Sequence, residues 1–187
     1  TVKVGTYGRM IHEMTEMMMI DMGQYAHGNQ PVHHMIYLYN YAGEPWKTQK
    51  WAREVMRKLY NAGPDGYCGD EDQGQMSAWY VMSSMGFYPV THGRAVYFVG
   101  TPIFPEVKLR HGRGVLTVRA NGVSRENRYI RSASLNGRPF TKNWLSHEEL
   151  FGGDATLTFE MGARPNRDWG SSPGDLPQSM CDEAFAE

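Results

Sequence analysis

Cysteine is scarce in this sequence, and long apolar runs are missing. Cys68 and Cys181 are the two cysteines among 187 residues, so a disulfide framework is excluded and the redox compartment stays open. No apolar run approaches the roughly 18 to 20 residues that a membrane-spanning helix needs. The opening residues, TVKVGTYGRM, lack the apolar stretch that follows the basic start of a secretion signal. We therefore expect a globular chain with neither a membrane span nor a signal in these residues.

A large excess of either charge is also missing. The formal net charge is −1, with 21% charged and 41% hydrophobic residues. A chain with this balance has no broad electric field that attracts nucleic acid or an anionic membrane surface. The composition and length are those of an ordinary globular protein that can bury a core.

Methionine, by contrast, is abundant and unevenly placed. Most of the 13 methionines precede residue 90, whereas residues 91–164 hold short runs of Val, Leu and Tyr between Gly, Pro and Asn. This shift predicts a helical region over residues 1–90 and a small β-rich domain over residues 91–164. Residues 165–187 are rich in Pro, Gly and Ser, and we expect a flexible, loosely held tail.

Four segments of the first region are predicted helices, because apolar residues recur near helical spacing and Pro or Gly marks the ends. These segments are residues 7–22, 31–42, 45–63 and 75–85. In the second region, β-forming residues alternate between turn residues, and Asn136-Gly137 is a strong hairpin signal. The predicted fold class is α+β, with a small antiparallel β-domain, expected to be a sandwich, after the helices.

His12, Glu13 and Glu16 place three titratable groups within five residues of the first predicted helix. His12 and Glu16 are four residues apart and share one helix face. A zinc peptidase would carry a second histidine where this chain has Glu16, so that interpretation is disfavoured. A surface ion pair on a methionine-packed helix and a site for a carbohydrate or a hard cation both stay open.

The segment AHGNQPVHH, residues 26–34, gathers amide and imidazole groups around Asn29. Such groups suit hydrogen bonding to sugar hydroxyls, because an amide side chain both donates and accepts. The residues alone nevertheless favour a polar loop that leads into a helix at Pro31.

Asp70, Glu71 and Asp72 stand side by side before the fourth predicted helix. Acids are common at a helix N-terminus, where the dipole favours them. An EF-hand is excluded, because the twelfth position counted from Asp70 is Val81 rather than a carboxylate. Aromatic neighbours beside carboxylates are typical of sugar-binding clefts, so a functional and a structural interpretation are about equal here.

Five ordered motifs point to one family. GDEDQGQMSAWYVMSSMGFYPV, together with IHEM, MGQYAHGNQP, HHMIYLYNYAG and EPWKTQKW, resembles glycoside hydrolase family 92, the calcium-dependent exo-α-mannosidases. The motifs are dense over residues 7–90, and LNGRPFTKNWLSHEEL at residues 135–150 continues the likeness.

The resemblance implies that residues 1–90 are the last helices of an (α/α)6 toroid and that the reaction inverts the anomeric carbon. In an inverting hydrolase one carboxylic acid protonates the leaving oxygen and one carboxylate activates water. Asp72 matches the general base, and Asp70 is a second catalytic candidate or a neighbour that raises the proton affinity of Asp72.

The resemblance also implies contacts to the substrate and a metal. His12 and Glu13 match contacts to the terminal mannose, and Asn29 is a further candidate substrate-binding residue. Ca²⁺ is the implied cofactor, and Glu13 and Glu16 are its candidate ligands in this chain, because calcium prefers oxygen donors.

One departure from the family pattern is informative. The general acid belongs to a Glu-Gly-Asn-Ala-Trp-type motif upstream of the Ile-His-Glu segment, and the 187 residues contain no such motif. We therefore expect the C-terminal portion of a larger enzyme, whose partner is its own N-terminal part and whose parent is periplasmic or secreted. The expected reaction is hydrolysis of terminal α-mannosides of N-glycans or mannans, with α-1,2 linkage favoured. The alternative is a carbohydrate-binding fragment that kept the sugar pocket and lost the acid.

Overall fold

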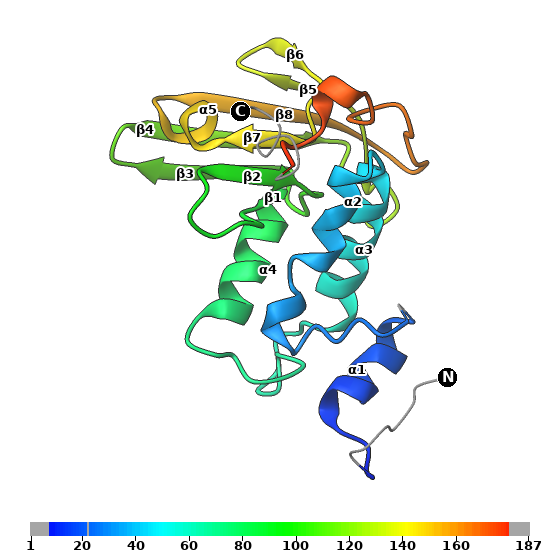
Figure 1. Cartoon of the computed structure of the whole chain (residues 1–187). Coiled ribbons are helices and arrows are strands. Elements are labelled where there is room, and N and C mark those ends of the chain that lie inside the picture. Colours follow the sequence, from blue (N-terminus) through cyan, green and yellow to red (C-terminus); the bar gives the residue numbers. More distant parts are fainter. Residues whose placement is uncertain (1–7, 22, 180–187) are drawn as a thin grey trace, which may run out of the picture.

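The computed structural model describes residues 8–21 and 23–179, with helices in the first half and strands in the second (Figure 1). The α-helices are α1 (His12–Ile20), α2 (Leu38–Tyr41), α3 (Pro45–Lys58), α4 (Gln75–Met85) and α5 (His147–Phe151). Short 3-10 helices are η2 (Gln30–Val32), η3 (Met35–Tyr37) and η4 (Pro173–Asp175). The strands are β1 (Phe87–Tyr88), β2 (Val96–Val99), β3 (Glu106–His111), β4 (Gly114–Asn121), β5 (Tyr129–Leu135), β6 (Arg138–Phe140), β7 (Trp144–Ser146) and β8 (Ala155–Gly162).

The predicted helices agree with the structure best where Gly and Pro set sharp limits. α4 spans the predicted residues 75–85, and Gly86 ends it in the left-handed region at φ 104°. α3 begins at Pro45 as predicted and ends at Lys58, before residue 63. α1 begins only at His12, so residues 8–11 are not helical, and the predicted ends at Tyr7 and Met22 lie outside the described residues.

The single helix predicted over residues 31–42 is wrong. This segment consists of η2, η3 and α2, which are separate short turns. Ile36 and Tyr37 are fully buried, and the hydroxyl of Thr48 on α3 donates to the Ile36 carbonyl. Because core packing and this side-chain bond hold the segment, tertiary contacts replace the regular helical ladder.

Two sheets form the second half of the molecule. The smaller has the order β1-β2-β7, and the larger has the order β3-β4-β8-β5-β6. The Asn136-Gly137 hairpin between β5 and β6 is confirmed, with positive φ at both turn residues. The expectation of a purely antiparallel domain is wrong at one place, since β8 runs parallel to β4. The chain leaves the large sheet after β6, passes through β7 and α5, and returns between β4 and β5, and such a crossover permits parallel pairing.

Both sheets share one hydrophobic core. Phe87, Val99 and Leu145 from the small sheet belong to the same buried cluster as Leu157 and Phe159 from the large sheet. A second buried cluster lies among the helices around Val55 and Trp79. The β1 strand precedes residue 90 and pairs with β2, so the first strand of the sheets lies on the helical side of the predicted domain boundary.

Buried polar side chains join the helices to the sheets. The amide nitrogen of Asn40 donates to the carbonyls of Val99 and Asn143 at 3.0 and 2.8 Å. The amide nitrogen of Asn143 donates back to the Asn40 carbonyl at 2.9 Å. Gln49 on α3 accepts the backbone N–H of Ile130 at 3.0 Å. These bonds fix α2 and α3 against the strands, so the helical part has a defined orientation on the β part (Figure 1).

The flexible tail predicted from residue 165 is wrong for residues 165–179. Trp169 is only 7% exposed, belongs to the core of the two sheets, and donates its indole N–H to the Phe140 carbonyl at 3.1 Å. The hydroxyl of Thr141 donates to the Asp175 carboxylate at 2.6 Å. One large aromatic residue is enough to anchor a segment whose composition is otherwise that of a loop. Residues 180–187 lie outside the described part.

Three architectural expectations have different outcomes. The mixed α and β class is confirmed. The closed (α/α)6 toroid stays a prediction, because it needs more helices than α1 to α4 supply. Within the described residues, no helix is both long enough and apolar enough to cross a bilayer.

Candidate active site

Glu16 is the most deeply buried of the predicted site residues. It lies on α1 with 3% exposure, and its two carboxylate oxygens have different partners. One oxygen bonds His12 Nδ1 at 2.9 Å, and the other accepts the backbone N–H of Gly28 at 2.6 Å. The surface ion pair that the spacing allowed is therefore wrong for Glu16, which ties α1 to the following loop.

His12 and Glu13 lie at the more open end of the same helix. His12 Nε2 is 3.3 Å from a Glu13 oxygen. The hydrogen bond to Glu16 raises the pKa of His12, partial burial opposes that rise, and the charges of Glu13, Glu16 and Asp70 reinforce it. The second Glu13 oxygen is buried and has no hydrogen-bond partner among residues 8–21 and 23–179. This helix turn therefore places an imidazole with a raised pKa beside the Glu13 carboxylate.

Gly28 permits the close approach of its loop to α1. A Cβ at this position would stand 2.4 Å from a Glu16 carboxylate oxygen, so a side chain there displaces the carboxylate. The next residue, Asn29, is exposed, and its side chain has no interaction with the described residues. Asn29 thus lies at the site with its amide group free, as a substrate contact requires.

Residues 26–34 form a loop that leads into η2 at Pro31, as the residues alone favoured, but two of its polar side chains are buried. His27 and His33 are buried, and their rings stack with centroids 4.4 Å apart. His27 bonds the hydroxyls of Tyr25 and Tyr60 at 2.7 and 2.6 Å, and its ring meets Trp79 edge-on at 4.3 Å. Burial lowers the pKa of both imidazoles, so they are neutral and act as packed hydrogen-bonding groups. Sequence reasoning missed this pair, although Tyr60, just after α3, and Trp79 on α4 supply aromatic contacts that bury it.

The pattern of hydrogen bonds gives the neutral tautomers a consistent assignment. Tyr60 donates to the Met76 carbonyl, so His27 donates to Tyr60 through Nε2 and accepts from Tyr25 at Nδ1. His33 donates through Nε2 to the His27 carbonyl at 2.8 Å. The backbone next to Gly28 is therefore held by the hydrogen bonds of the buried His27 and His33 side chains.

The acid loop, residues 70–72, packs against this same loop. The amide of Gln30 donates to the Asp70 carbonyl at 2.8 Å. A Cβ on Gly69 would lie 3.0 Å from the Cα of Gly28, so the two backbones touch. Asp70 and Asp72 are exposed, and Asp72 has a left-handed backbone with φ 52°. Asp72 therefore departs from an extended strand, and simple side-to-side alternation does not describe this loop.

Glu71 differs from both of its acidic neighbours, because its side chain holds the start of α4. Its carboxylate accepts the backbone N–H of Gly74 at 2.5 Å and both the hydroxyl and the N–H of Ser77 at 2.7 and 3.2 Å. The Ser77 hydroxyl, followed by the two N–H groups, lowers the pKa of Glu71. Of the three adjacent acids, Glu71 has the structural role, and Asp70 and Asp72 have carboxylates that face solvent.

A cavity of about 320 Å³ adjoins the acid loop. Its walls carry amide, imidazole and phenol groups from Gln30, His33, His34, Gln75, Tyr88 and His92. Gln75 donates to the Tyr88 hydroxyl at 3.1 Å and lies 3.4 Å from His33 Nδ1. These groups can donate to and accept from sugar hydroxyls.

Glu13 and Glu16 differ in how well their carboxylates suit a calcium ion. Among residues 8–21 and 23–179, no three or more His, Cys, Asp or Glu side chains are grouped so that they could hold a metal ion. The unpartnered buried oxygen of Glu13 fits a calcium ligand. Glu16 fits less well, because both of its oxygens already accept hydrogen bonds. Of the two candidate ligands, Glu13 therefore fits a calcium ion better than Glu16.

Comparison with known proteins gives a consistent result. The model of the glycosyl hydrolase family 92 catalytic domain matches residues 6–163. The chain is similar to the family GH92 inverting mannosidase BT2199 from Bacteroides thetaiotaomicron, with 53% identity over 96% of this chain and a TM-score of 0.79. It is also similar to the α-mannosidase BT3965 from the same organism, with 37% identity over 85% of this chain and a TM-score of 0.81.

A fungal relative and the lengths of all three proteins complete the comparison. An uncharacterized secreted glycosidase from Arthroderma benhamiae is 34% identical over 157 residues, or 82% of this chain. The chain spans 20% of that protein, 21% of BT3965 and 24% of BT2199. The matched proteins are therefore several times longer than this chain.

Proposed function

Because the chain belongs to glycosyl hydrolase family 92, we propose that the protein containing it hydrolyses terminal non-reducing α-mannosides with inversion at the anomeric carbon. The observation that carries the proposal is the convergence of α1, the loop at Gly28 and the acid loop at one end of the helices. The likeness to a protein described as an inverting mannosidase, at 53% identity over 96% of this chain, supports the reaction type.

In this proposal Asp72 is the general base. Its exposed carboxylate takes a proton from the attacking water, and Asp70 in the same loop is the second catalytic candidate. Glu71 has no catalytic role, since its carboxylate is already bound to the start of α4. The general acid is supplied by residues outside this chain, which spans about a quarter of its relatives or less.

The substrate lies between α1 and the acid loop. His12, whose pKa is raised, donates to a mannose hydroxyl, and Glu13 and Asn29 accept or donate beside it. Calcium, when bound, supplies a hard Lewis acid for sugar hydroxyls, with Glu13 as its ligand from this chain and Glu16 as a second candidate. Glu16 also keeps His12 and Gly28 in position.

The proposed substrates are α-1,2-linked mannosides of N-glycans or mannans, and the proposed location is outside the cytoplasm, as a periplasmic or secreted protein. The secreted description of the Arthroderma relative supports export. The alternative function is carbohydrate binding without catalysis, and the missing general-acid motif favours it for the isolated chain.

A stereochemical assay tests the function. Whole protein is mixed with the methyl glycoside of α-1,2-linked mannobiose, so that the cleaved terminal mannose is the only reducing sugar formed, and this first product is followed by proton NMR. We expect β-mannose first, because inversion of an α-linkage gives the β-anomer. α-Mannose as the first product would overturn inversion, and mannose binding without hydrolysis would favour the alternative function.

Chelation tests the cofactor separately. We expect activity of the whole protein to be lost in excess chelator and restored by Ca²⁺ but not by Zn²⁺, because the candidate ligands are oxygens. Full activity in chelator, with metal analysis showing no bound calcium, would contradict the calcium role and leave the hydrolase proposal intact.

A further inference from the structure

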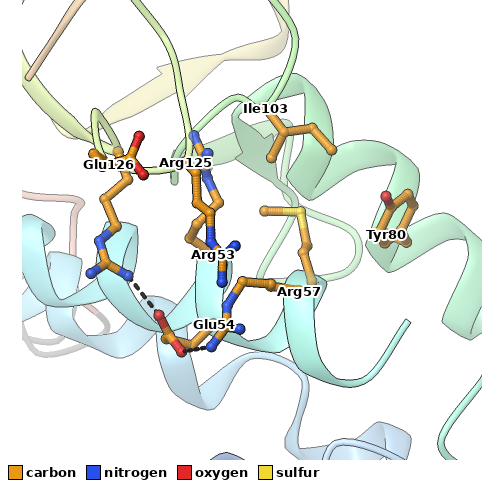
Figure 2. A pocket seen from close by; sticks show the side chains of 9 residues that line it. Arg53, Glu54, Arg57, Tyr80, Ile103, Arg125 and Glu126 are labelled. Atoms are coloured by element: carbon orange, nitrogen blue, oxygen red, sulfur yellow. Dashed lines mark hydrogen bonds and ion pairs between the residues drawn. The ribbon is translucent and has the colours of Figure 1, made fainter. Parts of the chain in front are cut away.

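A second, larger cavity lies apart from the candidate active site. It measures about 630 Å³ and lies between α3, α4 and the loops that follow β2 and β4 (Figure 2). We call it the arginine pocket, because Arg53, Arg57, Arg125 and Arg128 line it together with two glutamates. No residue of the candidate active site is among its lining residues.

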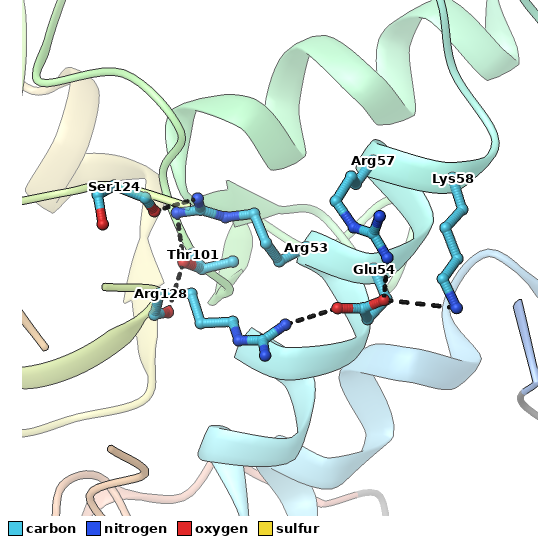
Figure 3. Close-up of polar contacts among 7 residues, drawn as sticks. All are labelled: Arg53, Glu54, Arg57, Lys58, Thr101, Ser124 and Arg128. Carbon is cyan, nitrogen blue, oxygen red and sulfur yellow. Dashed lines mark hydrogen bonds and ion pairs between the residues drawn. The ribbon is translucent and has the colours of Figure 1, made fainter. Parts of the chain in front are cut away.

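One of the two glutamates that line the arginine pocket, Glu54, is already paired with cations. Glu54 accepts from Arg57 at 2.9 Å and from Arg128 at 2.6 Å, and Lys58 lies 3.5 Å from it (Figure 3). These hydrogen bonds outweigh the effect of burial and lower the pKa of Glu54 to about 2. The single negative charge of Glu54 therefore faces the three positive charges of Arg57, Arg128 and Lys58.

Arg53 is a buried cation that no carboxylate of residues 8–21 and 23–179 contacts. It is 9% exposed, and its guanidinium donates to the carbonyls of Ser124 and Pro102 at 2.9 and 2.5 Å. Its Nε is buried and has no acceptor. Burial, together with the charge of Arg128, lowers the pKa of Arg53 to about 10. The positive charge of Arg53 is thus held by neutral groups alone, which is an unfavourable state for a buried ion.

Arg125 adds an exposed cation to the lining of the pocket. It is exposed, and among residues 8–21 and 23–179 its side chain has no hydrogen bond or ion pair. Figure 2 shows it beside Arg53. An exposed guanidinium with no partner keeps all five of its donors for a ligand.

The remaining wall of the pocket is apolar. Met56, Tyr80 and Ile103 contribute a thioether, a ring and an aliphatic side chain. A volume of this size lies in the range of small-molecule sites, which combine apolar walls with a few polar groups.

We propose that the arginine pocket binds the phosphate or carboxylate group of a small organic anion, whose body packs on the wall formed by Met56, Tyr80 and Ile103. Guanidinium groups match both oxyanions with paired N–H donors. An anion in the pocket compensates the charge of Arg53, which no carboxylate of the described residues contacts. This site is independent of the proposed hydrolase function.

Calorimetric titration of the whole protein with three probes tests the site. The probes are inorganic phosphate, glucose 6-phosphate and glucuronate, each at the same ionic strength. Comparing the two sugars distinguishes a phosphate from a carboxylate, and comparing the two phosphates shows what the sugar adds to binding. We expect at least one probe to bind. Arg125→Ala should weaken that binding about tenfold, as the loss of charge-assisted hydrogen bonds implies.

Two further variants make the test specific. Arg110→Ala is the matched control, because Arg110 is also exposed and lies on β3, away from the arginine pocket. Tyr80→Ala should weaken the sugar-bearing probes more than inorganic phosphate. Absence of binding by all three probes, or equal weakening by Arg125→Ala and Arg110→Ala, would overturn the proposal and leave the arginines as a clamp between α3 and the loops.

Discussion

Asp72 and Glu71 are adjacent acids whose substitutions should have different effects. In the whole enzyme we expect Asp72→Asn to lower kcat by roughly 10² to 10⁴, because the amide cannot take a proton from water. KM should change far less, since the loss is confined to the transition state. Steady-state kinetics of both variants measure the difference.

Glu71→Gln is the matched comparison for that experiment. It should keep most of kcat but lower the melting temperature, because Glu71 accepts from Gly74 and Ser77 at the start of α4. If Glu71→Gln loses kcat while its fold is intact, and Asp72→Asn is near wild type, the assignment of the base is wrong.

Gly28 is a position where one methyl group should disturb the site. A Cβ there would stand 2.4 Å from the Glu16 oxygen that bonds His12 and 2.8 Å from the one that accepts the Gly28 N–H. We expect Gly28→Ala to destabilise the protein by about 1 to 3 kcal/mol, as overpacking commonly does. Urea unfolding checks this value.

Gly153→Ala provides the control, because a Cβ at Gly153 meets nothing within 4 Å and its backbone is not in the left-handed region. It should leave stability within about 0.5 kcal/mol of wild type, as surface substitutions do. Equal stability of both variants would mean that Glu16 moves freely, contrary to its two hydrogen bonds.

The stacked pair His27 and His33 gives the 26–34 segment a pH dependence at the scale of elements. Burial lowers both pKa values below the ordinary 6.5, so between pH 6.5 and the lower folded values the unfolded chain binds more protons. The stability contribution is complete above pH 6.5 and falls as the pH drops. We expect about 2 kcal/mol less unfolding free energy at pH 5.5 than at pH 7.5.

The opposite effect of His12 should be small. Its pKa is raised, so its contribution is present below pH 6.5 and is lost as the pH rises through its folded value. Its side chain is 55% exposed, so solvent screens the interaction. Urea unfolding at both pH values measures the net change.

Two variants identify the source of the pH dependence. His33→Gln keeps a donor for the His27 carbonyl and removes one titrating ring, so it should reduce the loss by about half. His92→Gln, at an exposed position, should leave the loss unchanged. Stability that is constant from pH 7.5 to 5.5 would contradict the buried neutral pair.

At the scale of the whole molecule, we expect the 187-residue chain by itself to lack mannosidase activity and to self-associate. The general-acid motif is missing, and α1 exposes Met18 and Met19 at 50% and 55%. Exposed apolar patches favour association. An aryl α-mannoside assay together with size-exclusion chromatography over a range of concentrations tests both parts. A monomeric sample that hydrolyses the substrate would contradict them.

Not all apolar residues of the helices are as exposed as an incomplete toroid would leave them. Met14 is buried at 5% exposure, although an incomplete toroid would leave it without a partner. Trp51 is half-buried, and the ammonium of Lys50 lies 4.2 Å from its ring. The helices therefore cover part of their apolar surface by themselves, and exposed apolar side chains remain on α1, on η3 and α2, and on α4.

The sequence by itself determined the helix ends and turns that depend on the backbone preferences of single residues and their neighbours. Gly86 ends α4, Pro45 begins α3, and Asn136-Gly137 forms the hairpin, because each of these residues restricts or permits its own backbone angles. The family was also readable from ordered motifs, and the match over residues 6–163 confirms it.

Only the tertiary structure decided which polar residues are buried and what they contact. Nothing in the spacing of Glu16 distinguishes a surface pair from a buried carboxylate that binds Gly28. The roles of Asp72 and Glu71 differ only because Ser77 donates hydrogen bonds to the Glu71 carboxylate. The parallel pairing of β4 with β8 likewise depends on a strand that returns from far along the chain. Burial and long-range pairing arise from contacts between distant segments, and local preference holds no information about those contacts.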